Sequence, residues 1–417
     1  MSTRKPLYGW LTAEAISLTG TRMSMVALPW FVLTTTGSAT KTGLVALAEM
    51  LPLVVLKVLG GPVIDRVGAR RVAITCDALS LLAVGAIPLL HEAGRLSFPV
   101  LLLLVALAGA LRGPGDAAKS ALTPAVVEAA GVPMERATGL HSTVERTAGL
   151  LGAAGAAGLV AAVGAADALL VDAISFGVSA AVLAATTLSL RAARSEDADD
   201  TTPYGARLRQ GWDFLRRDRV LLGITVMVAL TNLLDAAYIT VLVPVWSKEL
   251  VGSANGVALV FAVFGGSAAL GAICAAAWAA RIPRRTTYLV AFLLAGAPRF
   301  VVMALDSPLW LVVGTCVVAG FAAGFINPIL GAVIFERIPT ELTGRVSALT
   351  TAMCFALIPF GGLLGGLLVA GVGLAPAMWI VGTAYLLVTV LPAVDPRWQE
   401  IDRRPENEAC QAKAAAT

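Results

Sequence analysis

The chain has little charge, few aromatic residues and almost no histidine. Only 14 % of its 417 residues are Asp, Glu, Lys or Arg, whereas a soluble chain carries about 25 %. Its two histidines and five cysteines show no metal-ligand spacing, and the sequence holds neither a Gly-x-Ser-x-Gly motif nor a nucleotide-binding loop. These absences argue against a membrane enzyme. Because the longest polar stretch, 190–219, is short, they also argue against a sensor or scaffold with a soluble domain.

The chain consists largely of long hydrophobic segments. Hydrophobic residues make up 58 % of it, with a mean hydropathy of +0.82. They come in runs of about 20, the length that crosses a ~30 Å hydrocarbon layer as a helix. We therefore predict an all-α membrane protein with twelve transmembrane helices and no cleaved signal before the first. The expected spans are 8–34, 41–59, 71–90, 97–118, 137–163, 167–189, 220–246, 255–280, 286–304, 308–335, 345–370 and 374–392.

The basic residues predict the orientation of these spans. If both termini are cytoplasmic, 22 lysines and arginines lie in inner segments, and only Lys41, Arg95 and Lys248 lie in outer loops. This asymmetry follows the rule that cytoplasmic loops carry the excess of positive charge. We expect a multi-pass protein of the bacterial inner membrane with both ends in the cytoplasm.

The two halves of the chain repeat one another. Four features recur in the same order at offsets of 209 to 215 residues: Pro29 with Pro244, 70–71 with 284–285, Pro114 with Pro328, and Gly164 with Gly373. The repeat predicts parallel halves with a substrate site at mid-membrane between them. The expected domains are a six-helix bundle over 1–190, a cytoplasmic loop over 191–219, a second bundle over 220–394 and a cytoplasmic tail over 395–417. Leu208, Trp212 and Leu215, spaced by four and three, predict a surface helix in the loop.

A polar island at 60–71 carries a recognisable pattern. Gly61, Asp65, Arg66, Gly68, Arg70 and Arg71 resemble the Gly-x-x-x-Asp-Arg-x-Gly-x-Arg-Arg signature between the second and third helices of major facilitator superfamily transporters. Segments 17–33, 122–127, 145–152 and 336–346 resemble the twelve-helix drug–proton antiporter branch, which includes macrolide exporters, siderophore exporters and Tap-type multidrug pumps. The resemblance implies the major facilitator fold, with two pseudo-symmetric six-helix bundles. It also implies proton-driven export of small amphipathic molecules by a monomer in the lipid bilayer, without a cofactor or nucleic acid.

Two departures from this pattern matter. The exporter motif of the fifth helix normally carries Gly-Pro, whereas Gly152 is followed here by alanine; we still expect close packing at Gly149, Gly152, Gly155 and Gly158. The second-half copy of the island, near 275–285, lacks the acidic residue and the glycines. One gate hinge is therefore expected to dominate.

Ionisable side chains deep in the spans are the candidates for mechanism, because such a group costs several kcal/mol in hydrocarbon unless it is paired or hydrated. Proton coupling needs a carboxylate that binds and releases a proton. Asp235, Glu49 and Glu145 are the options, and Arg112 aligns with an arginine that tunes such a carboxylate in proton-coupled facilitators. The alternative for each acid is a structural ion pair, for instance Glu145 with Arg112 or Arg22.

The remaining polar residues divide into three groups. Arg22, Asn232, Arg146, Arg299, Asn327 and Trp30 are the expected substrate-binding residues, with an interfacial tryptophan as the alternative for Trp30. By resemblance, Asp65 caps the start of helix eleven, and Arg66 or Arg70 pairs with Asp116 in a gate that also contains Gly61 and Gly68. Lys57 and Lys119 are read as solvated anchors, and Glu14, Asp77 and Asp172 as caps or interface anchors.

The scarcity of aromatic residues, 6 % of the chain, favours an amphipathic substrate over a sugar. Uptake or facilitated diffusion of a metabolite is the alternative transport function.

Overall fold

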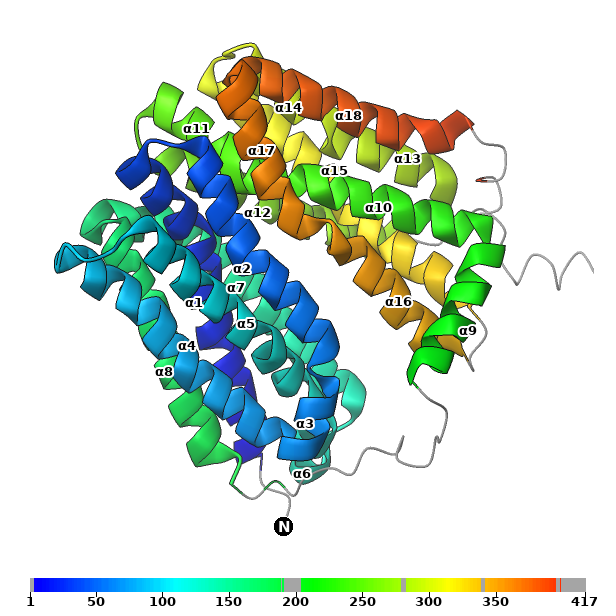
Figure 1. Cartoon of the computed structure of the whole chain (residues 1–417). Helices are drawn as coiled ribbons and strands as arrows, with labels where there is room; N and C mark the ends of the chain where they lie inside the picture. The colour runs from blue at the N-terminus through cyan, green and yellow to red at the C-terminus, as the bar shows by residue number, and fades with distance from the viewer. Residues whose placement is uncertain are drawn as a thin grey trace, which may run out of the picture. The chain divides into compact units, whose positions relative to one another are not determined.

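The structure is a computed structural model that describes residues 4–188, 190, 204–278, 283–338, 342–394 and 398. Helices make up almost all of this part of the chain (Figure 1). The first half holds α1 (Lys5–Thr36), α2 (Ala39–Leu59), α3 (Gly61–Val67), α4 (Ala69–Glu92), α5 (Phe98–Ala121), α6 (Thr123–Ala130), α7 (Met134–Val163) and α8 (Ala165–Thr186). The rest holds α9 (Tyr204–Arg217), α10 (Arg219–Ala237), the π-helical η2 (Tyr238–Leu242), α11 (Val243–Trp246), the π-helical η3 (Ser247–Val251), α12 (Asn255–Trp278), α13 (Arg284–Ala295), α14 (Ala297–Ala304), α15 (Leu309–Arg337), α16 (Thr343–Ala356), α17 (Ile358–Val372) and α18 (Leu374–Val394).

Ten helical stretches of the described residues are long and apolar enough to cross a membrane. The other two expected spans correspond to α7 and to α18, whose shorter apolar stretch is Leu374–Val390. The predicted all-α membrane fold is confirmed.

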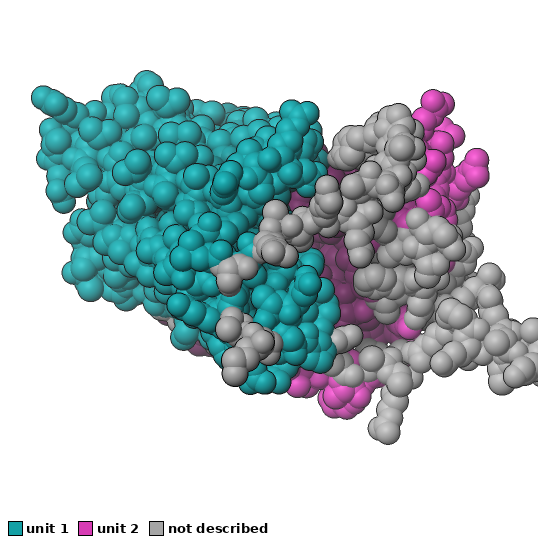
Figure 2. Space-filling view, turned by 90° about the horizontal axis from the view of Figure 1, so that it is seen from below, with its two compact units in different colours: residues 1–200, 236–262, 359–372 teal, residues 201–235, 263–358, 373–417 magenta. Residues whose placement is uncertain are grey.

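Packing divides the chain into two compact units (Figure 2). Unit 1 comprises residues 1–200, 236–262 and 359–372, and unit 2 comprises 201–235, 263–358 and 373–417. This division rests on proximity, and the two six-helix domains expected from the sequence repeat stay a prediction.

The core of unit 1 is built from α1, α2, α4, α5, α7 and α8. Phe31 of α1, Ile87 of α4 and Phe176 of α8 meet in one apolar cluster, and Leu7 and Leu183 belong to a second. Glycine forms the turns between consecutive helices. Gly68 joins α3 to α4 with a φ of +94°, a backbone conformation that residues with a side chain rarely adopt.

Glycine also sets how closely helices approach in unit 1. A Cβ added at Gly109 of α5 would lie 2.0 Å from the backbone oxygen of Glu49 on α2. On the other side of α2, a Cβ at Gly43 would lie 2.2 Å from the backbone oxygen of Gly362 on α17. Such backbone contact is possible only where a side chain is missing, as in other membrane helices.

The four glycines of α7 do not behave alike. A Cβ at Gly152 would lie 2.4 Å from Cβ of Arg22, and one at Gly155 would lie 3.0 Å from Met23, so both face α1. Gly149 and Gly158 have nothing within 4 Å of an added Cβ. The expectation of close packing is therefore wrong for these two. Each step of three residues turns about 60° short of a full revolution, so the first and last glycines of the run drift away from the side that meets α1.

Unit 2 contains the predicted helix of the central segment, α9. Leu215 is fully buried with Leu221, Ile338 and Val346, whereas Trp212 stays exposed. Asp218 caps α10 by accepting from the backbone nitrogens of Val220 and Leu221 at 3.1 and 3.0 Å. Leu215, on the apolar side of α9, therefore packs against other helices of unit 2. The sequence predicts a helix that lies on the membrane surface.

One residue of the expected cytoplasmic tail, Trp398, is packed against the protein. Trp398 is buried, its ring 6.1 Å from that of Tyr288, and it contacts Gly223. The reason is apolar area: a tryptophan buries a large surface wherever helices leave a recess. The other residues of 395–417 lie outside the described part of the chain.

A matched pair of substitutions tests the glycine contacts. Gly109→Ala should destabilise the protein by roughly 1–3 kcal/mol, because the methyl group overlaps the backbone of α2. Gly158→Ala is the control: its added methyl group meets nothing, so removing a helical glycine should stabilise by about 0.5–1 kcal/mol. Thermal unfolding of the two purified variants in the same detergent measures the difference. Equal melting temperatures would contradict the packing of α5 on α2.

Candidate functional site

Unit 1 contains a buried ion pair between α2 and α5. Nη1 of Arg112 lies 2.7 Å from Oε1 of Glu49, and the side chains are 11 % and 17 % exposed. Gly109, one turn before Arg112, brings the α5 backbone against Glu49 and so sets the distance. A charge-assisted bond of this kind compensates for the removal of both charges from water.

Unit 2 contains a second ion pair, between α10 and α14, in which the arginine is buried and the side chain of Asp235 is 31 % exposed. Arg299, 4 % exposed, donates from Nη2 to Oδ1 of Asp235. Its guanidinium lies 5.5, 5.2 and 5.6 Å from the ring centres of Phe264, Phe300 and Tyr385. The three aromatic rings contact the guanidinium by cation–π interactions, and the Asp235 carboxylate forms the ion pair with it.

The structure therefore groups the predicted deep residues differently from the sequence reading. Asp235 was expected to carry protons and Arg299 to bind substrate, yet they contact each other directly. The alternative pairing of Glu145 with Arg112 is absent from the described residues, because Arg112 pairs with Glu49 and Glu145 is exposed. Arg22 donates to the sulfur of Met25 at 3.6 Å.

The other predicted substrate residues lie apart from these pairs. Asn232 donates to the backbone oxygen of Cys354 at 2.9 Å and so ties α10 to α16. Trp30 packs against the apolar cluster of unit 1, and Asn327 is exposed on α15. The side chain of Arg146 lies outside the described part of the structure.

At the predicted gate, Asp65 and Arg66 are exposed, while Arg70 is not available to Asp116. Arg70 donates to Oγ1 of Thr187 at 2.9 Å and to the backbone oxygen of Ala184 at 3.0 Å. Within the described residues, no ion pair joins Asp116 to Arg66 or Arg70. The carbonyl groups in the last turn of a helix lack partners within it; here the carbonyl of Ala184 in α8 and the hydroxyl of the following Thr187 hold Arg70.

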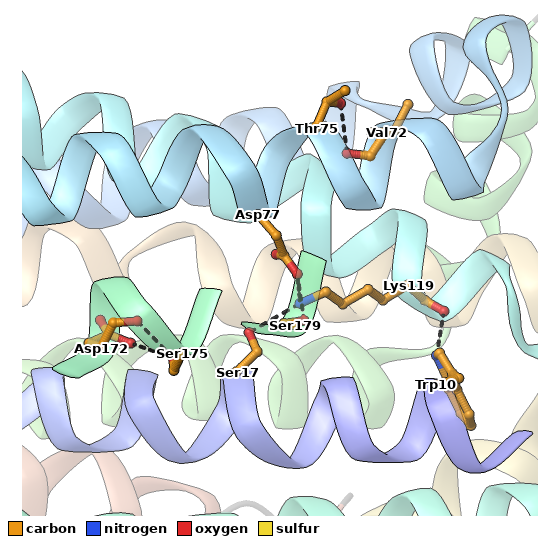
Figure 3. Close-up of polar contacts among 9 residues, drawn as sticks. All are labelled: Trp10, Ser17, Val72, Thr75, Asp77, Lys119, Asp172, Ser175 and Ser179. Atoms are coloured by element: carbon orange, nitrogen blue, oxygen red, sulfur yellow. Dashed lines mark hydrogen bonds and ion pairs between the residues drawn. The ribbon is translucent and has the colours of Figure 1, made fainter. Parts of the chain in front are cut away.

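A third buried pair was misread from the sequence. Nζ of Lys119 lies 2.9 Å from Oδ2 of Asp77 and donates to Oγ of Ser17 at 3.1 Å, while Ser179 donates to Asp77 at 2.6 Å (Figure 3). The indole of Trp10 donates to the backbone oxygen of Lys119. Lys119 is 1 % exposed, so the prediction of a solvated anchor is wrong: α4 supplies the carboxylate that allows its burial.

Asp172 and Glu14 were also taken for caps or interface anchors, and both are buried. Asp172 accepts from Oγ of Ser24 at 2.5 Å and from Oγ of Ser175 at 3.4 Å. The sequence signal that could have found them is periodic: Glu14, Ser17 and Ser24 are spaced by three and seven residues, which places them on one face of α1.

The family model described as Major Facilitator Superfamily matches residues 10–252 and 225–409. The chain belongs to the major facilitator superfamily.

Two relatives make the relationship closer. The chain is 32 % identical to the Multidrug efflux pump Tap of Mycobacterium tuberculosis strain ATCC 25618 / H37Rv over 417 residues, which is 97 % of each chain. It is 29 % identical to the Multidrug efflux pump Tap of Mycolicibacterium fortuitum over 404 residues, 96 % of this chain and 98 % of that one. The predicted resemblance to Tap-type exporters is confirmed, and this member of the superfamily is a transporter and not an enzyme.

Solved structures agree on the fold. A nucleoside transporter NupG (D323A mutant) aligns with a TM-score of 0.72 and 15 % identity, covering 96 % of this chain and 100 % of that one. A POT family transporter in complex with a thioalcohol-conjugated peptide aligns with a TM-score of 0.70 and 12 % identity, covering 93 % and 95 %. At these identities the likeness shows the major facilitator fold alone.

A double-mutant cycle tests the Glu49–Arg112 pair. Arg112→Ala alone should cost about 3–5 kcal/mol of stability, because it leaves a buried carboxylate without its partner. The double variant with Glu49→Ala should cost clearly less than the sum of the single changes. As a control, the exposed Asp213–Arg216 pair, 3.9 Å apart, should couple by no more than about 1 kcal/mol. Reversible unfolding in mixed micelles supplies the free energies, and additive costs at Glu49 and Arg112 would disprove the pair.

Proposed function

We propose that this transporter exports small amphipathic, drug-like molecules from the bacterial cytoplasm in exchange for protons, by alternating access. One observation carries the proposal: each unit holds an acid paired with a largely buried arginine, Glu49 with Arg112 and Asp235 with Arg299. The similarity to pumps named for multidrug efflux supports the substrate class.

The ion pairs supply a means of coupling. While the carboxylate is ionised, it neutralises the arginine. A proton that binds the carboxylate removes its charge and leaves the guanidinium buried without an anion, at a cost of several kcal/mol. A rearrangement that hydrates the arginine relieves this cost, so proton binding favours one conformation and proton release the other. Glu145 stays a third candidate for the proton carrier.

In this proposal the substrate contacts come from Arg22, Arg146, Asn232, Asn327 and Trp30. Arg299 stays a candidate contact once protonation of Asp235 releases it. Hydrophobic contacts with a few polar ones suit amphipathic ligands. The exporter acts as a monomer whose termini both lie in the cytoplasm.

The island at 60–71 serves as the inner gate. The Asp65 carboxylate stabilises the N-terminus of helix eleven, the positive end of its dipole. Arg66 or Arg70 forms an ion pair with Asp116 when the gate closes. Gly61 and Gly68 allow the turn. The seam between α2 and α17 is proposed as the outer closure. Thr40 donates across this seam to the backbone oxygen of Gly366 at 3.3 Å, and Lys248 of η3 donates to the backbone oxygen of Leu33 on α1 at 2.9 Å.

Inverted membrane vesicles test the direction and energy source. Ethidium, an amphipathic cation, should accumulate in vesicles energised by respiration, and an uncoupler should abolish the accumulation. Asp235→Asn should remove it too while the protein still folds, because the amide cannot exchange a proton. Glu92→Gln, an exposed acid at the end of α4, is the matched control and should behave as wild type. Equilibration without accumulation would favour the alternative, facilitated transport of a metabolite, as would uptake into intact cells.

The gate makes a separate prediction. Asp65→Asn should slow turnover several-fold with less effect on substrate affinity, since Asp65 stabilises one closed conformation and does not touch the ligand. Transport rates and equilibrium binding of ethidium in proteoliposomes separate the two quantities. An unchanged rate would eliminate the gating role of Asp65, and the exposed Glu128→Gln variant controls for the loss of one acid.

A further inference from the structure

Two buried polar stripes face each other between α1 and α8. The stripe on α1 has spacings of three, four and three, and that on α8 has spacings of three and four, so each follows one helix face. All of these side chains are buried, although the helices around them are apolar. The members are Glu14, Ser17, Thr21 and Ser24 on α1, and Asp172, Ser175 and Ser179 on α8.

Hydrogen bonds link the two stripes, which together are called the file, at two separate levels. At one level, Ser24 donates to Asp172 at 2.5 Å, and Ser175 donates to the backbone oxygen of Asp172 at 2.7 Å. At the other, the Asp77–Lys119 pair connects Ser179 to Ser17. Figure 3 shows the Asp172–Ser175 contact on α8 and the group of Ser17, Lys119, Asp77 and Ser179.

The middle of the file has room for polar groups because α1 has a glycine there. A Cβ at Gly20 would lie 2.2 Å from Oγ of Ser175 and 2.7 Å from Oδ1 of Asp172. Ser175 and Ser179 are one turn, about 6 Å, apart along α8. The register of the contacts puts the hydroxyl-bearing Thr21 at the level of this interval. From Glu14 to Ser24 the file is about 15 Å long.

Charged groups stand at both ends. At one end, Asp172 interacts electrostatically with Arg112 of α5 and Glu49 of α2. Glu14 interacts with Lys119 and Asp116 of α5, Asp77 of α4 and Glu145 of α7.

At the Glu14 end of the file, the buried acids outnumber the buried lysine, which favours proton exchange there. One lysine cannot neutralise both Glu14 and Asp77, so a proton on one of the acids balances the buried charges.

We propose that this file conducts the coupling proton between the Glu49–Arg112 pair and Glu14, inside a single helix bundle. The proposal rests on the proposed proton-coupled export.

Each transfer in the file balances. A proton arriving at the Asp172 carboxylate gives a neutral acid. Each hydroxyl then accepts one proton on its oxygen while it passes its own to the next group. Between Ser179 and Ser17, the Asp77 carboxylate takes the proton and gives it to Lys119, which has given one of its own protons to Ser17. Glu14, as a neutral acid, finally gives its proton to water and returns to the carboxylate, and no electron moves.

Proteoliposomes test the file with two readouts. A pH-sensitive dye follows proton movement driven by an ethidium gradient, and ethidium counterflow measures substrate exchange that needs no net proton movement. Ser24→Ala and Asp172→Asn should lower proton movement by about 10-fold or more, the size of a lost proton-transfer group. Counterflow should stay within about twofold of wild type, and Ser24→Thr, which restores the hydroxyl, should recover proton movement.

The controls separate the possible failures. Ser267→Ala removes a buried hydroxyl of α12 that donates to its own helix, at Val263 and Phe264, and should change neither readout. Glu14→Gln, at the far end of the file, decides the outcome if a central variant does not fold. Unchanged proton movement in the folded variants, or an equal loss of counterflow, would overturn the file. Wild-type protein that exchanges ethidium without moving protons would overturn the proposed function instead.

Discussion

The structure depends on the cost of placing charge in hydrocarbon. A carboxylate or guanidinium there must find a partner, and the partners in this chain come from other helices. Arg112 reaches Glu49, Arg299 reaches Asp235, and Lys119 reaches Asp77. Each pair joins two helices at a fixed height and so helps to hold its unit together.

Close helix approach makes these pairings possible, and the glycines allow it. Gly109 brings α5 against α2 beside the Glu49–Arg112 pair, and Gly20 opens space for Asp172 and Ser175. In lipid there is little hydrophobic gain from bringing two helices together, so backbone contact and polar bonds carry much of the association.

The sequence was sufficient for the fold and for part of the site. Runs of apolar residues gave the spans, and depth within them singled out Glu49, Arg112, Asp235 and Arg299. It could not give the pairing, because the partners lie 63 and 64 residues apart and meet only when helices pack. Lys119 and Asp77 were placed at a membrane surface because expected span ends set their depth. In the structure, α4 starts at Ala69 and α5 continues to Ala121, and the pair is enclosed between them. Trp398 escaped notice for a related reason: a lone aromatic residue in a polar segment does not reveal the recess that receives it.

If the transporter exchanges substrate for protons, binding of the substrate should drive the release of bound protons. The direct measurement is the pH change when an exported compound is added to the purified transporter in lightly buffered detergent solution. The account predicts that the wild-type protein releases protons on binding, and that a variant carrying both Glu49→Gln and Asp235→Asn binds the compound without releasing any. Binding to the wild-type protein with no proton release would contradict it.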